Sequence, residues 1–182
     1  MPGWQQFYKE NYNDSFELMS VAIDVQGADR PLHYIDEACA KFPTLLDKSN
    51  KLGRLLGFRI VPNGFLIDEN GVLKYREIGN FSIELPSTKQ MLVKWTRGSG
   101  PNLDNVLDNT EFHQMTIEVR RMFERGLELY EMGMTHQSID IWKKALELDP
   151  DNYIVRKQIW AVENPEKFYS GKIDTDWQKN RL

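Results

Sequence analysis

The side chains best suited to nucleophilic or metal chemistry are few in this chain: one cysteine and three histidines. Cys39 lies in segment 36–41 (DEACAK). A lone cysteine can form neither an intrachain disulfide nor a Cys-x-x-Cys redox centre. No basic residue precedes Cys39 and it is not at a helix N-terminus, the two settings that favour a thiolate. We expect Cys39 to be a small residue packed on a helix, with a reactive peroxidatic thiol as the alternative.

The three histidines do not have the spacing of a metal site. His113 and His136 are far apart in the sequence, and His33 stands alone on a predicted helix. We expect His33 to be a surface or half-buried side chain, with a ligand as the alternative. The sequence thus predicts no metal, no other cofactor and no catalytic residue within these residues.

Composition and charge exclude several classes of protein. The 182 residues are 41% hydrophobic and 27% charged, as in a soluble globular protein. Residues 1–98 carry equal numbers of basic and acidic side chains, and the remainder carries the net charge of −4, so no nucleic-acid partner is expected. No apolar run approaches the roughly 20 residues that span a bilayer. The first residues (MPGWQ) lack a signal peptide, so we predict a cytoplasmic protein with no membrane partner.

The remainder of the chain is organised around residues 55–79 (LLGFRIVPNGFLIDENGVLKYREIG). Gly57 is placed to stop a helix. Residues 65–67 are a short apolar run of strand type, and residues 68–71 (DENG) form a turn. Residues 72–76 are the returning strand, so the stretch predicts a β-hairpin that follows a proline-containing loop.

The pattern G-x-x-x-V-P-x-x-F-L-I-D-x-x-G in this stretch is similar to the second half of the thioredoxin-like redoxins, the group of thiol–disulfide oxidoreductases and AhpC/TSA-related peroxiredoxins. The resemblance implies that the Val61–Pro62 bond is cis and that Val61 and Pro62 bind substrate, because the backbone at this proline pairs with an extended substrate chain in that group. Family members usually have Thr or Ser after the proline, whereas Asn63 and Gly64 follow here. An ordinary hairpin after a proline loop is the alternative.

The neighbouring segments agree with this resemblance across about residues 1–80. The predicted elements are a helix at 4–12, a buried parallel strand at 16–25 ending in A-I-D-V-Q-G, a helix at 31–41, an extended segment at 42–47, a helix at 52–56 capped by Ser49 or Asn50, and a closing helix at 89–96 capped by Ser87. Residues 1–97 are therefore predicted to be a redoxin domain, and the fold class is α/β, an incomplete thioredoxin-like fold.

The C-terminal part is predicted to be all α, after a linker at 98–115 that begins with R-G-S-G-P. Residues 116–182 hold two helical patterns, 118–131 and 137–148, with a turn at Gly133, and a third at 153–162. The spacing of Gly126, Gly133, Trp142, Ala145 and the Asp149-Pro150 pair is similar to a tetratricopeptide (TPR) repeat, with a plain helical hairpin as the alternative. We expect this module to dock on the first domain or on another chain. The aromatic tail is expected to wrap onto the body, with a docking sequence for a partner as the alternative.

In the redoxin pattern a strand and the redox cysteines precede the helix that has a proline near its middle, which Met1-Pro2 matches here. The resemblance therefore implies a redox motif, with cysteine or selenocysteine, upstream of Met1, in a segment that could also have carried a signal peptide. Without its strand, two apolar sheet edges would be left unpaired. We predict the C-terminal portion of a thiol–disulfide oxidoreductase or peroxidase without independent catalysis, whose partners are a dithiol or disulfide substrate, a protein, or a second copy joined at these edges. The alternatives are a redox-inactive binding module and a peroxidase that uses Cys39 alone.

Overall fold

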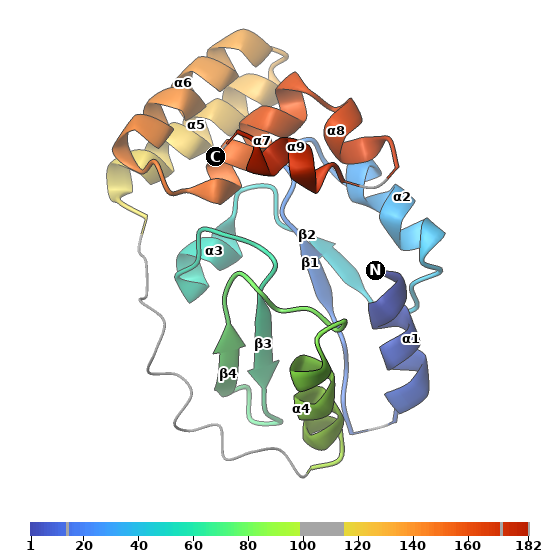
Figure 1. Cartoon of the computed structure of the whole chain (residues 1–182). Helices are drawn as coiled ribbons and strands as arrows, with labels where there is room; N and C mark the ends of the chain where they lie inside the picture. Colours follow the sequence, from blue (N-terminus) through green and yellow to red (C-terminus); the bar gives the residue numbers. More distant parts are fainter. Residues whose placement is uncertain (14, 99–114, 172, 182) are drawn as a thin grey trace. The chain divides into compact units, whose positions relative to one another are not determined.

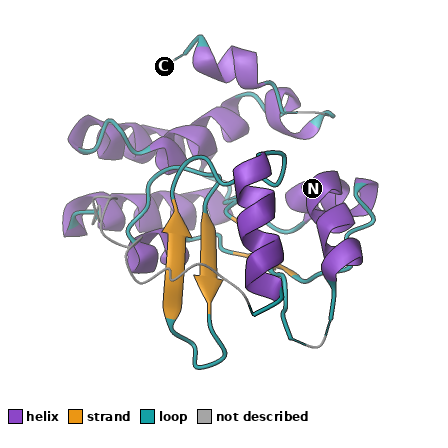
Figure 2. Cartoon of the chain, turned by 60° about the horizontal axis from the view of Figure 1, so that its bottom comes forward, coloured by secondary structure: helices purple, strands orange, loops and turns teal. Residues whose placement is uncertain are grey.

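The computed structural model describes residues 1–182 except 14, 99–114, 172 and 182 (Figures 1 and 2). Helices and strands are mixed up to residue 96, and helices follow from residue 117. The first part has α1 (Pro2–Asn11), β1 (Ser20–Ala22), α2 (Asp29–Glu37), β2 (Thr44–Leu46), α3 (Lys51–Leu56), β3 (Gly64–Ile67), β4 (Leu73–Glu77) and α4 (Pro86–Thr96). The second part has α5 (Ile117–Glu131), α6 (Thr135–Leu148), α7 (Tyr153–Glu163), α8 (Glu166–Tyr169) and α9 (Thr175–Lys179).

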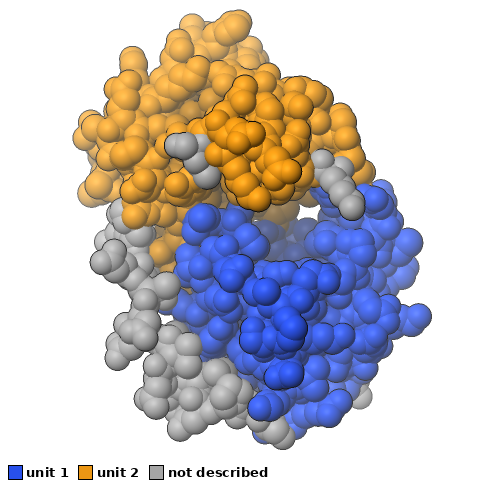
Figure 3. Space-filling view, in the orientation of Figure 1, with its two compact units in different colours: residues 1–21, 34–45, 60–113 blue, residues 22–33, 46–59, 114–182 orange. Residues whose placement is uncertain are grey.

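The chain forms two compact units whose segments alternate along the sequence (Figure 3). Unit 1 comprises residues 1–21, 34–45 and 60–113, and unit 2 comprises residues 22–33, 46–59 and 114–182. The division at residues 97 and 116 stays a prediction, and residues 99–114 of the expected linker lie outside the described part of the chain.

The strands form two separate two-stranded sheets, β1–β2 and β3–β4. Ser20 N donates to Pro43 O (3.0 Å) and Asp47 N donates to Ala22 O (2.8 Å), so the numbering of both strands rises together, as in a parallel pair. The β3–β4 pair is the expected hairpin and is antiparallel, with a register shift between Leu66 and Ile67. No strand of the described residues joins the two pairs.

The turn between β3 and β4 is closed by Asp68. Its carboxylate accepts hydrogen bonds from Asn70 N (3.0 Å) and Val72 N (2.8 Å), which lower the pKa of Asp68. Gly71 has φ +77°, a conformation that glycine adopts at low cost. The Asn70-Gly71 turn that the sequence predicts is therefore confirmed.

The core of unit 1 packs helices α1 and α4 with the hairpin. Phe7, Leu66, Phe81, Ile83 and Leu92 are its buried members. The ring of Phe81 lies so close to the backbone of β3 that any side chain at Gly64 would overlap it. A glycine at this position thus permits the loop after β4 to pack directly on β3.

The core of unit 2 packs helices α5, α6 and α7 around Trp142, whose exposed fraction is 0%. The indole Nε1 of Trp142 donates to Phe123 O (3.1 Å), and a Cβ at Gly126 would overlap the indole. The three helices, the turn at Gly133 and the close approach of α5 and α6 at Gly126 and Ala145 agree with the sequence prediction.

Two predictions about the first part are wrong in detail. The strand expected at 16–25 is restricted to Ser20–Ala22. Cys39 is not packed on a helix, because α2 ends at Glu37 and Cys39 is exposed with φ +48°. Ala40 N donates back to Ile35 O (3.1 Å), so a reversal that usually has glycine ends this helix at a cysteine.

Two helix starts also differ from the prediction. Asn50, one of the two expected residues, occupies the N-cap position of α3, but no side-chain hydrogen bond from it caps the helix. The Asp47 carboxylate does so, since it accepts from Lys51 N (2.9 Å) and Leu52 N (2.8 Å). Helix α4 begins at Pro86, ahead of the expected cap Ser87, because proline fits the first turn of a helix.

Candidate functional site

The loop that the sequence singles out, Val61–Pro62, lies in unit 1 directly before β3. The peptide bond between these two residues is cis. Val61 is half-buried and Pro62 is exposed. The loop is therefore accessible to another molecule from the side of the proline.

The side chain of Asn63 ties this loop to the segment that follows β4. Its Nδ2 donates to Ile60 O (2.6 Å), and its Oδ1 accepts from Gly79 N (2.8 Å). Gly79 has φ +86°, and Phe81 N donates a long hydrogen bond (3.5 Å) to Pro62 O. Both polar atoms of the Asn63 amide are thus used, one on the main chain just before Val61 and one on the segment that follows β4.

The main chain of Val61 is left open by this arrangement. Neither its N–H nor its C=O has a hydrogen-bond partner among the residues that the structure describes. A half-buried main-chain donor and acceptor next to each other can pair with an extended chain, as in recognition by strand addition. Recognition of this kind uses main-chain groups, so it does not depend on the sequence of the bound chain.

The strand edges of unit 1 are the second feature available to an extended chain. Strand β3 has β4 on one side, and no other described strand pairs with it; likewise β1 has β2 on one side only. Leu66 of β3 is buried, while Ile67 is exposed. An open apolar edge is a template for pairing with a further strand.

Cys39 and two of the three histidines, His33 and His136, belong to the described residues, and His113 lies outside them. Cys39 is exposed in the turn after α2, and His33 is half-buried, as expected. The described residues contain no group of three or more His, Cys, Asp or Glu side chains that could hold a metal ion.

A second polar cluster, in unit 2, was not anticipated from the sequence. The hydroxyl of Tyr169 donates to the carboxylate of Asp24 (2.7 Å), and Gln26 N donates to the same carboxylate (2.8 Å). Burial raises the pKa of Asp24 and, together with that carboxylate, the pKa of Tyr169. The guanidinium of Arg30 lies 4.9 Å from the centre of the Tyr169 ring.

The aromatic tail contributes to this unit as expected. Trp177 meets Trp160 of α7 edge to face at 5.7 Å, and Phe168 is buried. The tail therefore uses its aromatic side chains within the unit. The sequence signal for the polar partner of Tyr169 was slight: an aspartate after an apolar run.

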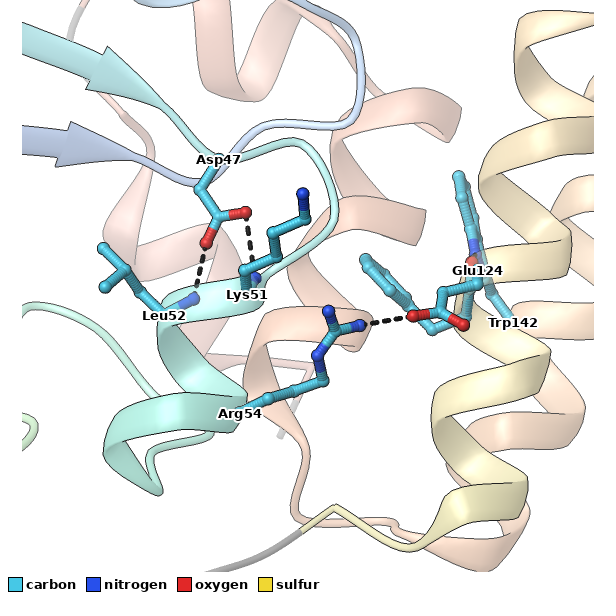
Figure 4. A network of polar contacts seen from close by, with 7 residues as sticks. Asp47, Lys51, Leu52, Arg54, Glu124 and Trp142 are labelled. Carbon is cyan, nitrogen blue, oxygen red and sulfur yellow. Dashed lines mark hydrogen bonds and ion pairs between the residues drawn. The ribbon is translucent and has the colours of Figure 1, made fainter.

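Residues 46–59 are also held to the helices of unit 2 by polar contacts (Figure 4). Arg54 Nη1 lies 2.6 Å from Glu124 Oε1, next to the Asp47 cap of α3. Lys48 pairs with Glu131, and Arg59 pairs with Asp149 at 3.1 Å. The helical module thus docks on segments that the sequence assigned to the first domain.

Comparison with known proteins gives one partial relationship. The chain is 28% identical over 98 residues to the sporulation thiol-disulfide oxidoreductase A of Bacillus subtilis (strain 168). The match covers 53% of this chain and 56% of that protein, so the chain spans little more than half of the curated relative. No family model matches the chain, and no solved structure matches it significantly. In the described part of the chain no helix has the length and apolar character to cross a membrane. The mixed α/β elements and this distant similarity support a thioredoxin-like relationship.

Proposed function

We propose that this chain is the substrate-binding body of a thioredoxin-like thiol–disulfide oxidoreductase or peroxidase. It binds an extended segment that carries a dithiol or disulfide, at the main chain of Val61 and beside Pro62. The observation that carries the proposal is the open N–H and C=O of Val61, held in place by Asn63. The similarity to a thiol-disulfide oxidoreductase supports the chemical class of the substrate.

The reacting group, in this proposal, is a cysteine or selenocysteine in a segment upstream of Met1. The separate β1–β2 and β3–β4 sheets support this, because one further strand from that segment would satisfy an open edge of each. Intact mass of the protein from its native source tests this step. A mass well above 21.4 kDa, with additional N-terminal sequence, is expected, and a mass equal to 21.4 kDa would contradict the upstream motif.

Backbone pairing at Val61 is tested by nuclear magnetic resonance on the 182-residue chain. The probe is a synthetic extended peptide that contains one cystine-linked pair. Its addition is expected to shift the amide resonance of Val61. Val61→Ala keeps the main-chain groups and should retain binding, whereas Val61→Pro lacks the N–H and should lose it. An unchanged Val61 resonance at saturating peptide would refute the proposed binding site.

The proposal assigns no catalysis to the described residues themselves. The expected result is no turnover of disulfide or peroxide by the chain alone. Turnover that disappears in Cys39→Ser would instead establish Cys39 as the nucleophile of a one-cysteine peroxidase.

A redox-inactive binding module is the second candidate function. In this version α5–α7 form a TPR-like repeat that docks a protein partner, and the division into domains at 1–97 and 116–182 applies. The packing of Gly126 against Trp142 supports a close helical pair. A native mass of 21.4 kDa together with peptide binding would favour this candidate.

Self-association and location complete the proposal. A second copy can pair with the open strand edges, so we expect a concentration-dependent dimer that a peptide bound at those edges dissociates. No nucleic-acid or membrane partner is proposed, and we place the protein in the cytoplasm. Sedimentation at increasing protein concentration tests the dimer.

A further inference from the structure

Helices α5, α6 and α7 of unit 2 hold a short segment, Ile23–Gln26, by a single apolar anchor. Val25 is 1% exposed and lies in a core whose other buried members all belong to these helices: Phe123, Ile139, Trp142, Val155 and Ile159. The segment itself lies outside the helices and strands, and its last two residues, Val25 and Gln26, form a turn. Its contact with the helical module therefore depends on its side chains and main chain, not on flanking secondary structure.

One side chain of α7 makes hydrogen bonds to the main chain of this segment on both sides of Asp24. The amide of Gln158 donates from Nε2 to Ile23 O (3.2 Å) and accepts at Oε1 from Val25 N (2.9 Å). A glutamine amide that meets the carbonyl before one residue and the N–H after it recognises the main chain there, whatever the side chain between them. Gln158 is itself buried, so these bonds are shielded from water.

The residue between these two main-chain groups is recognised by its carboxyl group. The carboxylate of Asp24 accepts a hydrogen bond from the Tyr169 hydroxyl at 2.7 Å. The same hydroxyl accepts from Gln26 Nε2 at 3.1 Å. The guanidinium of Arg30 packs over the Tyr169 ring and places a positive charge near the carboxylate.

The helical module thus offers an apolar pocket, an amide that binds the main chain and a hydroxyl that binds a carboxyl group. Together these three features define the kind of segment that it can bind. We propose that this face of α5–α7, together with Tyr169 of α8, is a recognition site for short segments in which an acidic residue directly precedes a small β-branched apolar residue. Ile23–Gln26 is its ligand within the same chain. The inference goes beyond the proposed redox function and does not depend on it.

The test uses the full chain with Val25→Asp, which removes the internal ligand by placing a charge in the apolar pocket. A synthetic peptide of residues 19–27 (MSVAIDVQG) is then added in the millimolar range, the concentration scale at which a tethered segment acts. The readout is the resonance of the Trp142 indole N–H, which lies in the same core as Val25. The peptide is expected to restore the wild-type resonance.

Matched controls separate recognition from non-specific binding. A peptide with the same Val25→Asp change should not restore the resonance. The unaltered chain should not respond to the peptide, because its site is filled. Gln158→Leu in the Val25→Asp chain should raise the dissociation constant about tenfold, since two hydrogen bonds to the peptide backbone are lost.

Restoration is the criterion whether or not the altered chain is folded before the peptide is added. Val25→Ser, a milder change, is examined with the same peptides. Restoration by the unaltered peptide alone supports the site. Failure of the peptide to restore the resonance in both variants, or equal restoration by the altered peptide, would overturn the proposal.

Discussion

The hydroxyl of Tyr169 donates a 2.7 Å hydrogen bond to the carboxylate of Asp24, which is only 8% exposed. The two residues are 145 positions apart, so this bond joins the tail of the chain to the segment that follows β1. It also provides a partner for a buried charge.

We predict that Tyr169→Phe destabilises the protein by about 1.5–3 kcal/mol, because a hydrogen bond to a buried carboxylate is lost while the ring packing is kept. Urea unfolding followed by circular dichroism measures this change. Tyr12→Phe is the control, since Tyr12 is 56% exposed, and its free energy of unfolding should stay within about 0.5 kcal/mol of the wild type. Equal values for the two variants would contradict a stabilising role of the Tyr169–Asp24 bond.

The buried carboxyl of Asp24 also predicts a pH dependence. Burial raises its pKa in the folded chain, so the folded state favours the protonated form. Its contribution to stability is full below about pH 4, the pKa of an exposed aspartate, and is lost as the pH rises through the higher folded pKa. Asp24→Asn stays neutral and keeps an acceptor for Tyr169. In urea unfolding, the free energy of unfolding of this variant should therefore increase relative to that of the wild type as the pH is raised from about 3 to about 7. A constant difference across this range would show that Asp24 titrates normally.

The cap of α3 gives a third prediction. Asp47→Ala leaves the N–H groups of Lys51 and Leu52 without their acceptor and should lower the free energy of unfolding by about 1 kcal/mol. Ser49→Ala should have no measurable effect, because no side-chain bond from Ser49 caps the helix. If Ser49→Ala lowered the free energy of unfolding more than Asp47→Ala in chemical denaturation, the cap would be Ser49, as the sequence suggested.

Close packing of α5 on α6 gives a fourth prediction. Gly126→Ala places a methyl group against the Trp142 indole, and we expect a loss of about 2–3 kcal/mol from overpacking. Gly133→Ala serves as a comparison, because no atom lies near its added methyl group but its φ is +77°. We expect this backbone conformation to cost about 1–2 kcal/mol of stability in the alanine variant. Thermal unfolding of both variants should rank Gly126→Ala as the less stable. An unchanged Trp142 indole resonance in Gly126→Ala would argue against the contact.

The Val61–Pro62 loop gives the fifth prediction. Asn63→Ala removes two hydrogen bonds to the main chain, and we expect a cost of about 1–2 kcal/mol and faster hydrogen exchange at Gly79 N–H. Asn70→Ala is the matched control, because Asn70 is exposed in the turn and its main-chain N–H bond to Asp68 survives the substitution. Peptide binding at Val61 should weaken in Asn63→Ala and not in Asn70→Ala. Unchanged exchange at Gly79 would mean that Asn63 does not hold the loop.

The sequence by itself determined the elements whose signals are local. Helices α5 to α7 follow from apolar spacing, and the β3–β4 hairpin follows from two apolar runs around Asn70-Gly71. Gly57 ends α3 with φ +68°, as its type suggests. These features depend on residues within a few positions of one another, so a single chain without relatives is enough to find them.

Only the tertiary structure decided which segments meet across long stretches of sequence. Nothing local indicates that Val25 fills the core of α5–α7, that Gln158 brackets its main chain, or that Asp47 rather than Ser49 caps α3. Such contacts depend on which apolar surface each helix leaves to cover and on which buried polar groups remain to be satisfied. Those demands exist only once the elements have packed, and that is why the cluster around Asp24 and Tyr169 had to be found in the fold.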